Sequence, residues 1–158
     1  MAVPRSSSPD FRIRRASNAD RDVLVDIWWR SAQATHRFLE ARELEVLRPE
    51  VQAMHLENLD TWVLCDPESN AIGFLVLNGR DVEALFIVPE WLRQSGGSLM
   101  LAHARALAGS LTVQVNEQNL DALKFYLAHG FAIVGRSETD SGGRPYPLLH
   151  LAQSVVRP

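Results

Sequence analysis

The chain of 158 residues contains one cysteine, Cys65, so it cannot form an internal disulfide. Cys65 ends the apolar run Trp62-Val63-Leu64-Cys65, where a buried strand thiol is more common than a nucleophile. No segment reaches the ~18 consecutive apolar residues of a membrane-spanning helix, and the N-terminus lacks the apolar core of a signal peptide. We therefore expect a cytoplasmic protein that is neither a disulfide scaffold nor a membrane protein.

The chain also lacks an excess of positive charge, with 16 Lys and Arg against 19 Asp and Glu. A net charge of −3 without a basic run argues against nucleic acid and membrane surfaces as partners. Neither a Gly-x-Gly-x-x-Gly fingerprint nor a Walker loop is present, which argues against the common nucleotide sites. We expect no metal site, because metal-ligand spacing is absent among the histidines, which stand at positions 36, 55, 103, 129 and 150.

What is present is an ordinary globular composition, 46% hydrophobic and 22% charged, in a chain the size of one domain. Residues 1–10, rich in Ser and Pro, are expected to be a disordered tail, and residues 11–158 a single domain. Periodicity and turn residues predict the order β-α-α-β-β-β-α-β-α-β-β, a mixed α/β fold. The expected segments are strands at 11–14, 61–65, 71–78, 81–88, 111–116, 131–137 and 147–153, and helices ending near 34 and covering 40–57, 97–108 and 119–129.

Some details of these segments follow from single residues. Asn18 or Asp20 is expected to cap the first helix, and Pro49 to break or restart the second. A polar loop is expected after Pro89.

The most informative segment is 116–131, which reads as the end of a strand, a capped helix and a stop. Asn119 is suited to cap the helix, and Gly130 to end it in the left-handed conformation. Asn119, Ala122 and Tyr126 lie at i, i+3 and i+7, on one stripe of the helix. The stripe fits either a surface that a ligand approaches closely or an amphipathic helix packed on the core.

The pattern Asn119-x-x-Ala122-x-x-Phe125-Tyr126-x-x-x-Gly130-Phe131, together with Val82–Pro89 upstream, resembles the second acetyl-CoA motif of the GNAT N-acetyltransferase superfamily. The resemblance covers nearly all of residues 11–153. It implies a single-domain GNAT fold, with a mixed, mostly antiparallel sheet of about seven strands flanked by about four helices. It also implies acetyl-CoA as the acyl donor.

The same resemblance assigns the cofactor-binding residues. The family's phosphate loop, Arg/Gln-x-x-Gly-x-Gly/Ala, corresponds here to an altered stretch with two possible registers. Counting from Pro89 puts Ser95 and Gly97 at the glycine positions, whereas sliding by one puts Gly96 and Ser98 there after Arg93. Both registers leave small residues at a helix N-terminus, which attracts phosphate. The expected set is Arg93, Gln94, Ser95, Gly96, Gly97 and Ser98, with Asn119, Ala122, Phe125 and Tyr126 from the later helix and main-chain groups of Leu85, Phe86 and Ile87.

Catalytic and acceptor-binding residues also follow from the resemblance. Tyr126 matches the family's general acid, since a phenol can protonate a departing thiolate. Glu83, placed by alternation on one face with Leu85 and Ile87, is the first candidate for the general base. His36 is its rival, because an imidazole titrates near neutrality. His36, Phe38, Glu83 and Tyr146 are expected to line the acceptor site.

The segments Ala34–Leu39 and Arg144–Leu151 resemble signatures of an uncharacterised bacterial GNAT branch. The alternative for Tyr146 is a packed side chain in a strand start stiffened by Pro145 and Pro147.

The sequence therefore predicts an N-acetyltransferase that moves an acetyl group to a primary amine of a small molecule or peptide by direct transfer in a ternary complex. The amine is not identified, and a homodimer is left open. The second hypothesis is a non-catalytic acyl-CoA-binding or regulatory module with a degenerate phosphate loop.

Overall fold

The computed structural model describes residues 10–35 and 60–154, which form one seven-stranded sheet in the order β1-β2-β3-β4-β5-β7-β6. Within these residues β4 and β5 run parallel and the other neighbours antiparallel, so the expected mixed, mostly antiparallel sheet is confirmed. The strands are β1 Arg12–Arg15, β2 Asp60–Cys65, β3 Ala71–Asn78, β4 Asp81–Ile87, β5 Thr112–Asn116, β6 Phe131–Ser137 and β7 Leu148–Gln153.

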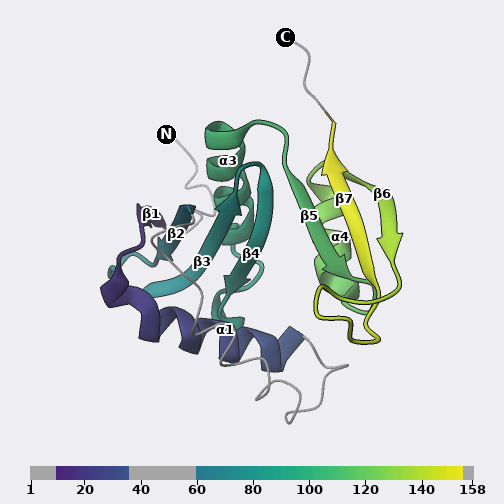
Figure 1. The fold of residues 1–158 in the computed structure, drawn as a ribbon. Coiled ribbons are helices and arrows are strands. Elements are labelled where there is room, and N and C mark those ends of the chain that lie inside the picture. Colours follow the sequence, from purple (N-terminus) through teal and green to yellow (C-terminus); the bar gives the residue numbers. More distant parts are fainter. Residues whose placement is uncertain (1–9, 36–59, 155–158) are drawn as a thin grey trace.

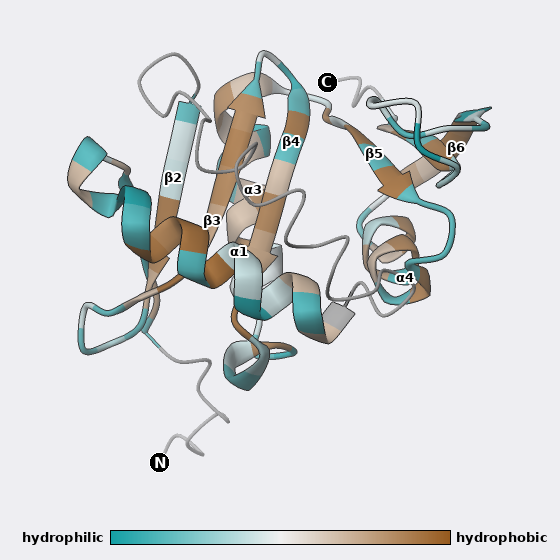
Figure 2. Ribbon diagram, turned by 60° about the horizontal axis from the view of Figure 1, so that its bottom comes forward, coloured by the Kyte–Doolittle hydropathy of each residue, from teal (hydrophilic) through white to brown (hydrophobic). Residues whose placement is uncertain are grey.

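The helices of the described residues are α1 Arg21–Thr35, α3 Gly96–Ala108 and α4 Leu120–Ala128, with short 3-10 helices η1 Asn18–Asp20 and η2 Pro89–Trp91. Figures 1 and 2 show α1 on one face of β3 and β4, and α3 and α4 on the opposite face of the sheet. The predicted helix at 40–57 lies outside the described residues. The segment after Pro89 was expected to be a polar loop, but it begins with η2.

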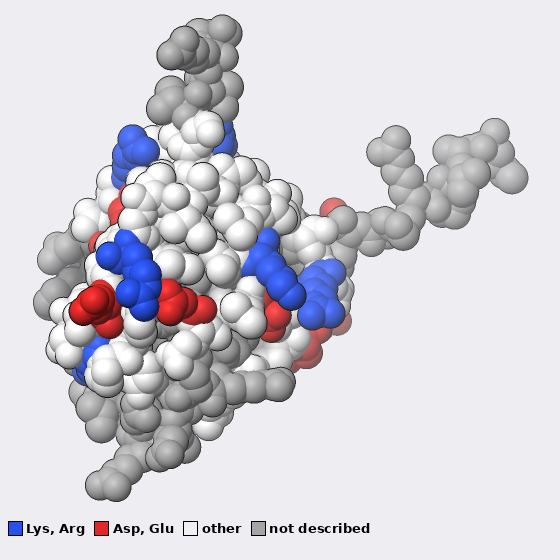
Figure 3. All heavy atoms as spheres, turned by 90° about the vertical axis from the view of Figure 1, so that its right-hand side faces the viewer, with Lys and Arg blue, Asp and Glu red and all other residues white. Residues whose placement is uncertain are grey.

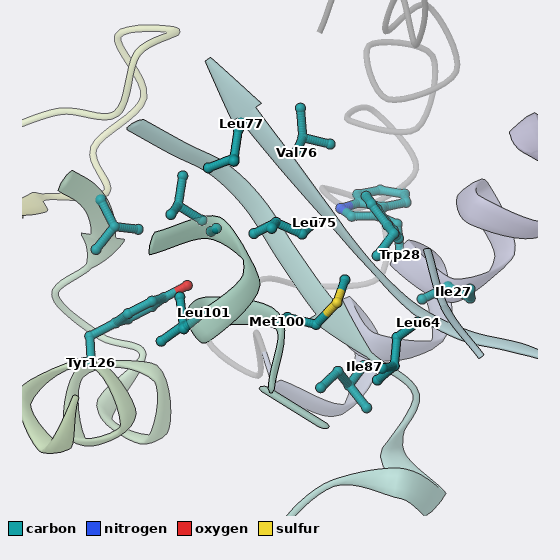
Figure 4. Packing of buried hydrophobic residues seen from close by; sticks show 14 of the residues in the cluster. Ile27, Trp28, Leu64, Leu75, Val76, Leu77, Ile87, Met100, Leu101 and Tyr126 are labelled. Atoms are coloured by element: carbon teal, nitrogen blue, oxygen red, sulfur yellow. The ribbon is translucent and has the colours of Figure 1, made fainter. Parts of the chain in front are cut away.

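The core lies between the sheet and the helices on its two faces. Side chains alternate along β3, so Leu75 faces Met100 and Leu101 of α3, whereas Val76 points toward Trp28 of α1 (Figure 4). Figure 2 shows the apolar residues concentrated in β3 and β4, where a strand covered on both faces loses its polar alternation. Cys65 is free and 4% exposed, as the sequence predicted.

The cap before α1 differs from the prediction, because the N-cap of the helical segment that leads into α1 is Ser17 and neither Asn18 nor Asp20. Ser17 precedes the 3-10 turn η1, and its backbone N–H donates to the Asp20 carboxylate at 2.8 Å. The same carboxylate accepts two hydrogen bonds from Arg14 of β1, each 2.9 Å long. Asp20 therefore ties the helix start to the first strand, which no local pattern reveals.

Within the described residues, no helix is long and apolar enough to cross a membrane. The same part of the chain brings together no group of three His, Cys, Asp or Glu side chains that could hold a metal ion.

Candidate functional site

The parallel strands β4 and β5 separate soon after they meet. They pair at Asp81 with Thr112 and at Val82 with Val113, and the hydroxyl of Thr112 donates to the Asp81 carboxylate at 2.8 Å. Beyond Val82, β4 continues to pair with β3 but not with β5. Figure 1 shows the two strands diverging from this closed end. Beyond Val82, the edge of β4 that faces β5 therefore has no strand partner in the described part of the chain.

The ladder between β3 and β4 determines which main-chain groups reach that edge. The N–H of Val88 donates to the carbonyl of Ile72 at 2.9 Å, so every second residue of β4 before Val88 directs its groups toward β3. Phe86 belongs to that set, whereas Leu85 and Ile87 direct their N–H and C=O groups to the opposite edge. The carbonyl of Ile87 accepts a 2.9 Å hydrogen bond from the hydroxyl of Ser31. The N–H groups of Leu85 and Ile87 thus point toward the opening.

The N-terminus of α3 lies beside the last residue of β4. No side chain among the described residues caps this helix. Leu99 is the first residue of α3 whose N–H donates to a main-chain carbonyl, that of Ser95 at 3.0 Å. The N–H groups of Gly96, Gly97 and Ser98 have no such partner among the described residues. Three main-chain donors at the positive end of a helix dipole make a surface suited to phosphate oxygens.

The loop geometry favours the first of the two registers. Ser95 has a φ of 74°, in the left-handed region that glycine adopts without strain. A Cβ atom on Gly97 would lie 2.9 Å from the ring of Phe125, and one on Gly96 would lie 2.8 Å from Leu64, so both glycines are closely packed and crowding alone does not separate the registers. Ser95 and Gly97 are the glycine positions counted from Pro89. Arg93, the first residue of the second register, also has a positive φ, 63°.

The predicted signals at the ends of α4 are confirmed. The side chain of Asn119 accepts a hydrogen bond from the N–H of Ala122 at 3.2 Å, and Gly130 has a φ of 84°. Tyr126 is 7% exposed, and its ring packs against Phe125 and Phe131 at 5.1 and 5.2 Å. Figure 4 shows its hydroxyl directed from α4 toward Leu101 of α3. Burial raises the pKa of the Tyr126 phenol, which therefore keeps its proton at neutral pH.

Glu83, the first candidate for the general base, does not lie in the regular strand position that the sequence predicted. Val82 pairs with Leu77 and Ala84 with Val76, so Glu83 is the extra residue of a β-bulge. Alternation does not carry across a bulge, and the expected common face of Glu83 with Leu85 and Ile87 does not follow. The carboxylate is exposed and accepts a 3.2 Å hydrogen bond from Asn78. It stands on β4 directly after the closed end of the opening.

The other predicted acceptor residues are placed only in part. His36 and Phe38 lie outside the described residues. Tyr146 is half-buried, just before the start of β7, and Pro147 follows it. Since β7 lies between β5 and β6, the two prolines mark the start of an interior strand rather than an edge.

Sequence reasoning missed two side chains near the opening. Ser31, 2% exposed, holds the Ile87 carbonyl, and its signal was a polar residue on the apolar stripe of Leu24, Ile27 and Trp28. His129 hydrogen-bonds Ser98 of α3 at 2.8 Å, a contact between elements that no spacing predicts.

Residues 21–131 match the acetyltransferase (GNAT) family. The chain is 41% identical over 140 residues to the peptidyl-lysine N-acetyltransferase YjaB of Escherichia coli (strain K12), covering 89% of this chain and 95% of the relative. The solution structure of apo YjaB from Escherichia coli superimposes with a TM-score of 0.84 at 40% identity, covering 92% of this chain and 99% of that one. The PaiA N-acetyltransferase of Thermoplasma acidophilum in complex with coenzyme A shares the fold, with a TM-score of 0.75 at 18% identity over 92% of this chain and 99% of that one.

Proposed function

The chain belongs to the acetyltransferase (GNAT) family and is an acetyl-CoA-dependent N-acetyltransferase, and from this premise we propose that its acceptor is the lysine side chain of a peptide or protein. The observation that carries the proposal is the identity with a peptidyl-lysine N-acetyltransferase over most of the chain. The net charge of −3 also suits an acceptor that arrives as a cation. On the face of the molecule over β6, basic side chains lie beside acidic ones (Figure 3).

The cofactor would be held where the sequence predicted it. The free N–H groups at the start of α3, from Gly96 to Ser98, suit the pyrophosphate, with Arg93 and Gln94 alongside. The edge of β4 at Leu85 and Ile87 offers N–H groups for the pantetheine arm and the thioester carbonyl. The stripe of Asn119, Ala122, Phe125 and Tyr126 on α4 would form the opposite wall. When bound, acetyl-CoA supplies the acetyl group as a thioester, with a thiolate as the leaving group.

In this arrangement Tyr126 acts as a general acid. Its buried phenol keeps its proton and is available to donate it to the sulfur as the bond to the acetyl carbon breaks. We assign the developing oxyanion to the N–H donors that Leu85 and Ile87 direct to the open edge of β4. Transfer is direct, with both substrates bound, since the mechanism needs no nucleophilic side chain.

The acceptor amine has to lose a proton before it attacks. We assign this role to Glu83, whose exposed carboxylate on the β4 bulge is accessible to water, and keep His36 as the rival. Phe38 and Tyr146 complete the proposed acceptor site. Both alternatives predict that kcat/KM falls as the pH drops below the value at which the base gains its proton.

A peptide panel tests the acceptor. We would incubate the protein with acetyl-CoA and an N-terminally blocked peptide containing one lysine, and locate the product by mass spectrometry. The matched controls are the same peptide with arginine in place of lysine, and an unblocked peptide without lysine. Acetylation of the lysine Nε alone is expected. Turnover only of the α-amine, or only of small free amines, would overturn the proposal.

The place and assembly of the enzyme are further parts of this proposal. We expect it to act in the cytoplasm, without nucleic acid or a membrane as partner, and leave a homodimer as a prediction for light scattering after size-exclusion chromatography. The second hypothesis, a non-catalytic module with a degenerate loop, is disfavoured by the enzymatic relatives. The altered loop also keeps a left-handed backbone conformation at Ser95, as a glycine there would, and this supports a loop that can still bind the cofactor.

A further inference from the structure

His129 connects the end of α4 to the start of α3. It is the residue after the last turn of α4, and its half-buried imidazole makes two hydrogen bonds. One joins Nδ1 to the main-chain oxygen of Phe125 at 2.7 Å, and the other joins Nε2 to the hydroxyl of Ser98 at 2.8 Å. The imidazole also packs on the ring of Phe125, with 4.4 Å between the ring centres. Both helix ends therefore meet at this side chain.

The first of these bonds determines which ring nitrogen carries the hydrogen. A carbonyl oxygen only accepts, so Nδ1 has to be the donor to Phe125. In the neutral imidazole Nε2 is then an acceptor, and the hydroxyl of Ser98 has to donate its hydrogen to it. Ser98 in this state directs its hydrogen inward, toward α4, and leaves only lone pairs for any ligand at the start of α3.

Ser98 belongs to the proposed phosphate site. It is the third residue of α3 and is exposed, and its N–H is one of the three main-chain donors without a main-chain partner. Gly97, its neighbour, faces the Phe125 ring on which His129 packs, so the site and the histidine are held by the same contact. An oxygen lone pair aimed at a phosphate opposes binding, whereas a hydroxyl hydrogen favours it.

We propose that His129 is a proton-linked positioning residue of the pyrophosphate site, acting through Ser98. When His129 gains a proton on Nε2, that N–H donates to the Ser98 oxygen, and the hydroxyl hydrogen is released to point toward a phosphate oxygen. The imidazolium adds a positive charge next to the same site. One proton is taken from solvent, and no other bond changes. Cofactor binding and protonation of His129 then strengthen each other to the same degree. The inference rests on the proposed placement of the cofactor at α3.

The groups packed around His129 are uncharged. Among the described residues, the imidazole of His129 contacts Ser98 of α3 and Phe125 of α4. The main-chain N–H of His129 donates to the carbonyl of Tyr126 at 3.0 Å, and its carbonyl accepts from the amide of Gln153 of β7 at 3.0 Å. None of the side chains of these residues carries a charge or changes its protonation between pH 5 and 8.

Calorimetry with dephospho-CoA tests the linkage. This probe keeps the pyrophosphate but lacks the 3′-phosphate, whose own titration near pH 6 would interfere. We expect its affinity to rise about three- to tenfold between pH 8 and pH 5.5, with net proton uptake seen as a dependence of the heat on the buffer. Pantetheine, which lacks the pyrophosphate, should show neither effect.

Three variants test whether His129 is the group that takes up the proton. His129→Gln keeps a polar side chain of similar length that cannot be protonated, and should bind dephospho-CoA with an affinity independent of pH. Ser98→Ala should lose most of the pH dependence although the histidine remains. His150→Gln is the matched control, because His150 bonds Ser137 at 2.6 Å on β7 and β6, away from α3, and should behave like the wild type. Melting temperatures report whether each variant is folded.

The outcomes separate the two proposals. If the wild type binds neither CoA nor dephospho-CoA, the proposed placement of the cofactor is wrong. If it binds both but with the same affinity at every pH, or if His129→Gln retains the full dependence, the role of His129 is refuted and the cofactor site stands. A pH dependence of the same size with pantetheine also refutes it.

Discussion

At the residue scale, the buried phenol of Tyr126 keeps its proton at neutral pH and so has one to donate, although burial also makes it a weaker acid. Replacing it with phenylalanine removes the hydroxyl and leaves the ring contacts with Phe125 and Phe131. We expect kcat to fall about 10²- to 10⁴-fold while CoA affinity barely changes, because proton donation matters only in the transition state. Steady-state kinetics and calorimetry measure the two quantities.

Tyr146→Phe is the chemical control for that prediction, because it removes the only other tyrosine hydroxyl of the chain. Its effect should fall on KM for the peptide rather than on kcat. Unchanged kcat in Tyr126→Phe would leave α4 with a binding role alone.

Asp20 is a buried residue whose charge contributes to stability. Hydrogen bonds from Arg14, and then from Ser17, lower the pKa of its carboxyl group to about 2 against the opposing effect of burial. The carboxylate is therefore favoured in the folded state, and its contribution is present above the unfolded pKa of about 4 and is lost as the pH falls toward 2.

We expect Asp20→Asn to lower the free energy of unfolding at pH 7 by about 1–2 kcal/mol, a figure reduced because Arg14 is half exposed. Urea denaturation at pH 7 and at pH 2.5 should show the difference from the wild type shrinking at the lower pH. Asp60→Asn, which breaks the exposed pair with Arg15, is the control and should cost less than about 1 kcal/mol. Equal effects of the two variants would contradict the argument.

At the scale of elements, the start of α3 stores strain in one residue and depends on close packing at another. Ser95→Gly relieves a left-handed conformation and should raise the free energy of unfolding by up to about 1 kcal/mol. Gly97→Ala places a Cβ 2.9 Å from Phe125 and should lower the free energy of unfolding by about 1–3 kcal/mol and weaken CoA binding.

Urea denaturation and CoA calorimetry on both variants check these directions. A Ser95→Gly variant that is less stable than the wild type would mean that the loop does not need its left-handed residue. Gly79→Ala is a useful comparison, since Gly79 also has a positive φ of 62° but no atom within 4 Å of an added Cβ, which isolates backbone strain from crowding.

At the scale of the whole molecule, the sheet is joined across β4 and β5 by pairs at only two positions. A cofactor that bonds the free edge of β4 and the start of α3 should connect the two halves. At ~100 times its Kd, acetyl-CoA should add about 2.7 kcal/mol to the free energy of unfolding, seen as a higher melting temperature.

Hydrogen exchange shows where the cofactor acts. Acetyl-CoA should slow amide exchange most at Leu85, Ile87 and Gly96–Ser98, by more than the rise in global stability explains. The additional slowing should be small in β1 and β2. Protection spread evenly over the sheet would mean that the cofactor does not lie in the opening.

By itself, the sequence determined what depends on neighbours along the chain. The capped start and glycine stop of α4 and the ends of most strands were predicted to within one or two residues, because those signals lie within a few positions of the structure they specify. The motif at 119–131 identified the family for the same reason.

Only the tertiary structure decided what depends on residues distant in the sequence. The bulge at Glu83 arises from the register between β3 and β4, the ion pair of Asp20 from the approach of β1, and the hydrogen bond of His129 from the meeting of α3 and α4. The support for the first register of the loop before α3 comes from the φ angle of Ser95. These features follow from which surfaces pack together, and packing brings together partners that no local pattern contains.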